Sequence, residues 1–81
     1  MKELKIKLDT IEKVKNFVTT TTRFDCDFDI SSISQRYTVD GKSIMGIFSL
    51  DLSRILTLKI HADNDAMLNE IETALTPYVI N

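Results

Sequence analysis

Ser43 is the residue of this 81-residue chain that is best placed to do chemistry. It lies in the run Gly-Lys-Ser-Ile-Met-Gly-Ile-Phe-Ser-Leu at positions 41–50. Serine at the start of a short helix is a favourable N-cap, because its hydroxyl accepts a hydrogen bond from an amide of the first turn. The same amides favour an anion, so a phosphate on this hydroxyl would be tolerated. Ser43 is therefore either a cap alone or a cap whose hydroxyl can also carry a phosphate.

Apolar side chains crowd the two helical turns that follow this serine. Ile47 and Leu50 are three residues apart and share one face, and three more apolar residues spread over the neighbouring face. Because two turns of helix cannot bury all five, we expect part of this surface to stay exposed and to bind a protein partner. The predicted partner-binding residues are Lys42, Ile44, Met45 and Phe48.

The ten residues around Ser43 resemble the segment around the regulatory serine of HPr, the small phosphocarrier of the sugar phosphotransferase system. A weaker similarity extends over nearly the whole chain through the order and spacing of its elements. The resemblance implies an α+β fold, the HPr-like open-faced β-sandwich of order βαββαβα, with a four-stranded antiparallel sheet and three helices on one face. It also implies that a dedicated kinase phosphorylates the serine and that the apolar residues behind it dock partners.

The histidine of an HPr phosphocarrier lies at the N-terminus of the first helix, and an arginine follows two residues later, before a proline. Imidazole is nucleophilic near neutral pH, and helix amides with a guanidinium hold the phosphoryl oxygens. The matching positions here carry Thr10, Glu12 and Lys13, and no histidine or arginine lies between Lys2 and Thr22. Thr10 has no base to activate it, and Glu12 repels phosphate. The resemblance therefore implies a divergent member without histidine phosphocarrier activity.

The other candidate side chains predict no catalytic group and no metal or cofactor site, and we expect no enzyme activity. His61, the only histidine, alternates with the strand residues that face the core, so we expect it on the solvent side of the sheet. Cys26 has no second cysteine for a disulfide or a metal pair. Asp25, Asp27 and Asp29 alternate along an expected strand edge, but without the glycine of a calcium loop they indicate a solvated face.

Apolar periodicity predicts the elements that hold these residues. Alternation predicts strands over residues 3–8, 27–32, 36–40 and 56–62, and Ser31, Ser32, Ser34 and Gln35 predict a turn between the second and third of them. Spacings of three and four predict a first helix with its apolar face on Ile11, Val14, Phe17, Val18 and Thr21. We expect this helix to fray in the threonine run of residues 19–22. A last helix opens at residues 63–65 and stops at Pro77.

Composition sets the class of protein. Eighty-one residues with 43% hydrophobic and 27% charged content indicate a single domain, 1–81. The net charge of −2 leaves no basic surface for nucleic acid. No apolar run approaches the roughly 18 residues of a membrane span and no signal peptide is evident, so we expect a cytoplasmic protein.

Three functions remain open. The first is a regulatory or adaptor protein of the phosphotransferase system or of carbon catabolite control. Its expected partners are an HPr serine kinase or a transcriptional regulator. The second is an HPr-fold protein-interaction or dimerisation module, possible as a homodimer, with no phosphorylation role. The third is a phosphocarrier that uses another residue, for which His61 is the only histidine available.

Overall fold

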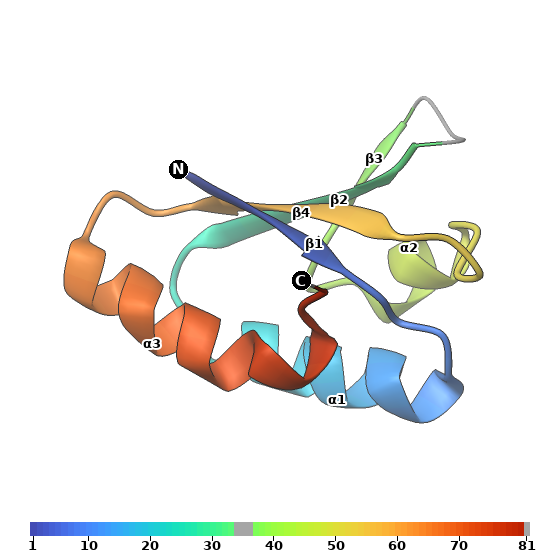
Figure 1. Cartoon of the computed structure of the whole chain (residues 1–81), viewed down its shortest axis with the longest axis horizontal. Coiled ribbons are helices and arrows are strands. Elements are labelled where there is room, and N and C mark those ends of the chain that lie inside the picture. Colours follow the sequence, from blue (N-terminus) through green and yellow to red (C-terminus); the bar gives the residue numbers. More distant parts are fainter. Residues whose placement is uncertain (34–36, 81) are drawn as a thin grey trace.

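A four-stranded antiparallel sheet carries the helices on one of its faces in the computed structural model, which describes residues 1–33 and 37–80 (Figure 1). The strands are β1 (Lys2–Ile6), β2 (Asp27–Ser32), β3 (Thr38–Asp40) and β4 (Leu56–His61). Their order in the sheet is β1-β4-β2-β3, so the first and last strands of the chain are neighbours. This arrangement confirms the predicted α+β fold.

Three α-helices lie below the sheet in the view of Figure 1. They are α1 (Ile11–Thr21), α2 (Ile44–Phe48) and α3 (Asp65–Leu75), and a 3₁₀ turn (Thr76–Tyr78) follows α3. Each α-helix begins at a side chain that caps it: Thr10, Ser43 and Asn64, respectively. None of the helices in the described part of the chain is long and apolar enough to cross a membrane.

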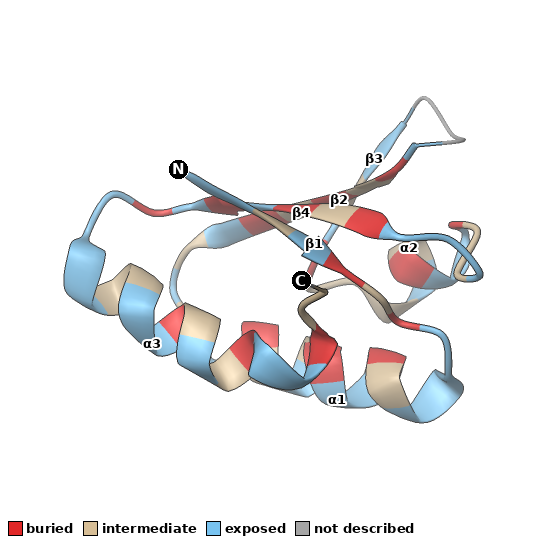
Figure 2. Cartoon of the chain, in the orientation of Figure 1, coloured by how far each residue is buried: buried red, intermediate tan, exposed pale blue. Residues whose placement is uncertain are grey.

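The hydrophobic core lies between the sheet and the helices, where buried residues of both layers face each other (Figure 2). Alternate residues of β2 and β4 point inward, as the period-two pattern predicts. Full burial of each such aliphatic or aromatic side chain is worth about 1.5–3 kcal/mol. The largest fully buried side chains are Phe17, Phe28, Ile6, Leu8, Ile30, Ile47, Leu56, Leu58, Ile60, Ile71, Leu75 and Val14.

The first helix departs from its prediction at both ends. Ile11 is 64% exposed, because the first residue of the helix lies beyond the edge of the core. The predicted fraying of the threonine run is wrong, since α1 stays regular through Thr21. The hydroxyls of Thr19 and Thr20 donate to carbonyls of the preceding turn, and Thr21, fully buried, donates to Gly41 of the segment before α2. Tertiary contact therefore overrides the weak helix propensity.

The second strand also occupies an unexpected place. The expectation that Asp25, Asp27 and Asp29 lie along a strand edge is wrong for Asp29, which pairs with β4 on one side and with β3 on the other. Asp27 pairs with β4 alone, and Asp25 lies before the strand. The third strand is observed over Thr38–Asp40. The predicted turn at Ser34 and Gln35, and the predicted start of that strand at Arg36, lie outside the described residues.

The end of the chain returns to β1. The amide of Lys7 donates to the Tyr78 carbonyl oxygen, and the amide of Ile80 donates to the Lys5 carbonyl oxygen, both at 2.9 Å. Ile6 and Val79 form an antiparallel bridge between these two bonds. The segment after α3 thus covers one end of the edge strand β1, and it places Ile80 beside the open face of the sheet.

Candidate functional site

Ser43 occupies the N-cap position of α2, as predicted. Its backbone is extended, with φ −107° and ψ 111°, and its Oγ accepts a hydrogen bond from the amide of Gly46 at 3.1 Å. Its carbonyl oxygen accepts the first helical bond from the amide of Ile47 at 3.0 Å. The residue is partly exposed at the start of the helix.

The segment before Ser43 is fixed by the core. A turn closes between the Asp40 carbonyl oxygen and the Ser43 amide at 3.0 Å, and the Gly41 amide donates to the Phe28 carbonyl oxygen at 2.7 Å. A Cβ on Gly41 would lie 2.6 Å from the Cβ of Phe28, closer than side chains approach. The Thr21 hydroxyl donates to the Gly41 carbonyl oxygen at 2.9 Å. Strand β2 and helix α1 together hold the start of α2 in place.

Gly46 makes room for the serine hydroxyl. A Cβ at this position would lie 3.2 Å from Ser43 Oγ and 3.3 Å from the Cβ of Val39. Glycine costs about 1 kcal/mol in a helix relative to alanine. Here it lets the first turn of α2 pack closely against β3 while the hydroxyl keeps its bond to the Gly46 amide.

Lys42, predicted to help bind a phosphate or a partner, directs its ammonium to another segment. Its Nζ donates to the Phe24 carbonyl oxygen at 2.7 Å and lies 5.9 Å from the centroid of the Phe28 ring. Its amide donates to the Asp40 carboxylate at 2.9 Å. A phosphate on Ser43 therefore has to compete with a carbonyl oxygen between α1 and β2 for this cation.

The apolar residues of α2 divide between core and solvent. Ile47 is fully buried and Leu50 is 5% exposed, which anchors the helix against the core. Met45 is 78% exposed and Phe48 is 39% exposed, while Ile44 is partly buried against the core. We call Ile44, Met45 and Phe48 the α2 surface. Exposed groups of this kind mark protein-binding sites more often than chance allows.

Tyr37 adds an aromatic ring near the end of α2, a contact that no sequence pattern predicts. Its hydroxyl donates to the Ser49 carbonyl oxygen at 2.7 Å, and its side chain is 45% exposed. Tyr37 lies just before β3, and alternation predicted only that it would share a face with Val39. No pattern in the sequence connects it to residue 49, because the contact depends on how α2 packs beside β3.

The start of α1 holds Thr10, Glu12 and Lys13, the residues that the resemblance places at a phosphocarrier's active site. Thr10 Oγ1 accepts from the Lys13 amide at 3.0 Å, and the Thr10 carbonyl oxygen accepts from the Val14 amide at 3.1 Å. The Lys13 ammonium donates to the Asp9 carboxylate at 3.0 Å, and this hydrogen bond lowers the pKa of Asp9 below its usual value. Glu12 is exposed in the first turn. Thr10 therefore acts as a helix cap with no general base bonded to it.

His61 lies on the face of the sheet away from the helices, as predicted. Its Nε2 is 2.6 Å from a carboxylate oxygen of Asp29, and both side chains border a depression of about 540 Å³ with Asp27 and Asp40. The Asp29 carboxylate in contact with the imidazole opposes a phosphoryl group on it, and Asp27 and Asp40 add negative charge to the same depression. Among the described residues no group of three or more histidine, cysteine or acidic side chains could hold a metal ion.

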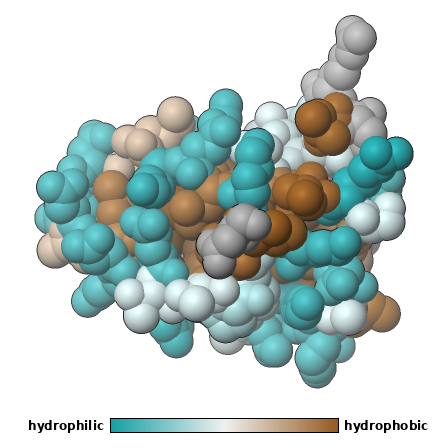
Figure 3. Space-filling view, viewed as in Figure 1, coloured by the Kyte–Doolittle hydropathy of each residue, from teal (hydrophilic) through white to brown (hydrophobic). Residues whose placement is uncertain are grey.

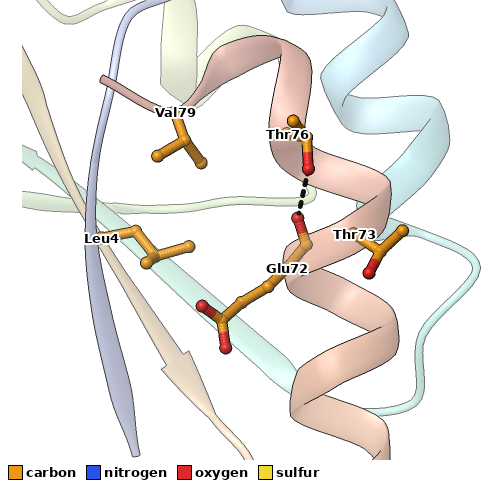
Figure 4. Close-up of a pocket in the computed structure, with 5 residues that line it drawn as sticks. All are labelled: Leu4, Glu72, Thr73, Thr76 and Val79. Atoms are coloured by element: carbon orange, nitrogen blue, oxygen red, sulfur yellow. Dashed lines mark hydrogen bonds between the residues drawn. The ribbon is translucent and has the colours of Figure 1, made fainter. Parts of the chain in front are cut away.

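Cys26 and the cavity between β1 and α3 have no catalytic arrangement. Burial raises the pKa of the Cys26 thiol, which disfavours the reactive thiolate. The cavity of about 310 Å³ is lined by the five residues in Figure 4. Thr76 Oγ1 donates to the Glu72 carbonyl oxygen there, and the Glu72 carboxylate lies 3.8 Å from the Lys2 ammonium. Neither place pairs a nucleophile with a base.

The chain matches one protein-family model and several solved structures. The family model described as "PTS HPr component phosphorylation site" matches residues 12–76, a stretch that includes Ser43 and starts two residues after Thr10. No curated protein sequence matches the chain closely enough to be identified as a relative.

Solved structures of two bacterial proteins are similar to this chain. HPr-C-His from Thermoanaerobacter tengcongensis has a TM-score of 0.74 and 27% sequence identity, over 95% of this chain and 89% of that chain. The phosphocarrier protein HPr from Bacillus anthracis str. Ames has a TM-score of 0.62 and 25% identity, over 90% of this chain and 92% of that chain.

Proposed function

The chain belongs to the HPr family of the phosphotransferase system, and we propose that it is a member without histidine phosphocarrier activity. We propose that it acts as a regulatory or adaptor protein of the phosphotransferase system or of carbon catabolite control. Its working site is the start of α2, where Ser43 accepts a phosphoryl group. The partners that fit this role are an HPr serine kinase and a transcriptional regulator in the cytoplasm.

The observation that carries this proposal is the exposed apolar surface beside a capping serine. Ser43 Oγ is held at the first turn of α2, and Met45, two residues later, is 78% exposed. A phosphate on Ser43 would add a charge of about −1.5 to −2 next to that surface. The modification would change which partners accept the α2 surface, while the helix amides compensate the added charge.

The start of α1 supports the loss of carrier activity. Thr10, at the position that the resemblance gives to the histidine, uses its hydroxyl oxygen as a cap acceptor. Glu12 puts a negative charge where the resemblance expects a cation, and Lys13 is paired with Asp9. His61, the only histidine, lies among carboxylates on the opposite face of the sheet.

A kinase assay tests the regulatory role. We expect an HPr serine kinase with ATP to add one phosphate, which mass spectrometry of peptides places on Ser43. The Ser43→Ala variant should take up none, and Thr10→Ala, which removes the equivalent hydroxyl cap of α1, should be phosphorylated normally. Absence of phosphate on Ser43, under conditions that modify an ordinary HPr, would contradict the proposal.

A transfer assay tests the absence of carrier activity. Incubation with labelled phosphoenolpyruvate and Enzyme I should leave this chain unlabelled while an ordinary HPr becomes labelled. Acid-labile label that disappears in His61→Ala would show that His61 carries the phosphoryl group. The proposed absence of histidine phosphocarrier activity would then be wrong.

An interaction or dimerisation module is the second candidate. The exposure of Met45 and Phe48 favours it, because an apolar surface can bind a partner without any modification of Ser43. Light scattering distinguishes the two candidates: a dimer that Met45→Asp dissociates, together with no phosphorylation of Ser43, supports the module.

A further inference from the structure

A second apolar surface lies on the open face of the sheet, away from α2. It is a groove of about 530 Å³ lined by Lys5, Ile33, Arg54, Ile55, Thr57 and Ile80. Lys5 and Thr57 are paired across β1 and β4, and the Lys5 ammonium donates to the Thr57 hydroxyl at 2.7 Å. Their strand neighbours Ile6 and Leu56 are fully buried, so this pair points away from the helices.

Three isoleucines form the apolar wall of this groove. Ile33 follows the end of β2 and is 90% exposed, Ile55 precedes β4 and is 48% exposed, and Ile80 is partly exposed beside β1. Figure 3 shows hydrophobic surface among hydrophilic side chains on the side of the molecule that faces the viewer in Figure 1. Aliphatic side chains from three separate segments meet here in contact with solvent, so this surface gains free energy when a partner covers it.

The charge of the groove selects the partner. Two cations and no carboxylate line it among the described residues, although the chain as a whole carries −2. Lys5 lies 3.9 Å from Glu3, and Arg54 Nε lies 3.6 Å from Asp51, whose carboxylate also accepts from Ser53 at 2.6 Å. Such loose, exposed ion pairs are weak. Arg54 can therefore turn to an incoming carboxylate, and the Lys5 ammonium, which has three N–H donors, can pair with one while it keeps its bond to Thr57.

We propose that this groove docks an extended segment of a partner protein that carries aliphatic side chains and carboxylates. Aliphatic side chains cover the isoleucines, and carboxylates pair with Lys5 and Arg54. A second copy of this chain fits poorly, since a groove-to-groove contact across a two-fold axis brings the same cations together. The groove and the α2 surface lie on opposite sides of the sheet, so the chain can hold two partners at once.

Peptide titration of the full chain tests this proposal. The probes are blocked octapeptides of alternating leucine and glutamate or alternating leucine and glutamine, added to the ¹⁵N-labelled protein. We expect amide shifts to change at residues 33, 55, 57 and 80, and the glutamate peptide to bind about fivefold more tightly. The double variant Lys5→Gln, Arg54→Gln should remove that difference, and Ile33→Ser with Ile55→Ser should weaken both peptides.

A matched control and three outcomes decide the test. Lys59→Gln changes an exposed lysine of β4 outside the groove and should preserve the preference for the glutamate peptide. Equal binding of the two peptides would overturn the proposal, and so would shifts confined to α2. Shifts that depend on protein concentration without peptide would also overturn it, because they identify a second copy as the occupant.

Discussion

Helix α1 begins at Thr10 and helix α2 begins at Ser43, and in both the capping hydroxyl accepts from the amide three residues later, at 3.0 Å and 3.1 Å. The surroundings of the two caps differ. The cap of α1 is exposed and its neighbours form a local ion pair, Asp9 with Lys13. The cap of α2 follows Gly41, which is held by the core.

This difference shows that capping geometry does not by itself define a functional site. A hydroxyl needs an activating base to become a nucleophile, or a recognition surface to become a kinase target. Neither cap has a base, but α2 presents Met45 and Phe48 beside its serine. Variants at the two helix starts test this difference in phosphoryl transfer, stability and pH dependence.

The largest expected effect is a gain of function at the start of α1. Thr10→His with Glu12→Arg, made in a His61→Ala background, places imidazole and guanidinium at the positions of the family's pair. We expect this variant to accept label from phosphoenolpyruvate through Enzyme I, measured as acid-labile phosphate. Thr10→Ala with Glu12→Arg is the control and should stay unlabelled. If the histidine variant also stays unlabelled, these two substitutions are not sufficient to make the chain a phosphocarrier.

The second largest effect is a loss of stability when the contact between Gly41 and Phe28, before α2, is disturbed. Gly41→Ala places a Cβ 2.6 Å from Phe28 Cβ and should lower the free energy of unfolding by about 2 kcal/mol. Urea denaturation measures the loss. Gly46→Ala should cost less, because its Cβ would meet Ser43 Oγ at 3.2 Å and Val39 Cβ at 3.3 Å, contacts that small shifts relieve, and alanine regains helix propensity. Equal losses in both variants would mean that the Gly41 contact is not what fixes the start of α2.

The two capping hydroxyls should contribute equally to the free energy of unfolding, but only one of them should be phosphorylated. Thr10→Ala and Ser43→Ala each remove one capping bond, and each should cost about 1 kcal/mol in urea denaturation. Only the second should abolish phosphorylation. If Ser43→Ala costs far more than Thr10→Ala, the serine is needed for folding and its assay as a phosphate acceptor needs the Ser43→Thr variant.

The smallest expected effect is the pH dependence of the α1 start. The hydrogen bond from Lys13 lowers the pKa of Asp9, so the folded state favours the carboxylate. The resulting stability is present above the unfolded pKa of about 3.9 and is lost as the pH falls through the lower folded value. An NMR titration of the Asp9 carboxyl should show a pKa that rises in Lys13→Gln. Lys42→Gln is the control. It removes a cation that binds the Phe24 carbonyl oxygen instead of Asp9, so the Asp9 pKa should stay unchanged.

Local patterns predicted most of the elements. Alternation predicted the buried faces of β2 and β4, and three-and-four spacing predicted α1 and α3. The Ser43 cap was predicted because capping involves residues only three apart. The exposed end of α1 at Ile11 was missed, because a repeating pattern does not show where the core stops. The edge position assigned to Asp29 was wrong, because pairing order is a long-range property.

By itself, the sequence determined which stretches form helices and strands, where the helices begin, and that the only histidine is His61. These properties depend on side-chain period and on hydrogen bonds between residues close in the chain. Only the tertiary structure decided that Lys42 reaches Phe24, that Tyr37 reaches Ser49, and that three isoleucines meet on the open face. Those contacts join segments whose approach is set by packing of the sheet against the helices, and no local pattern encodes that packing.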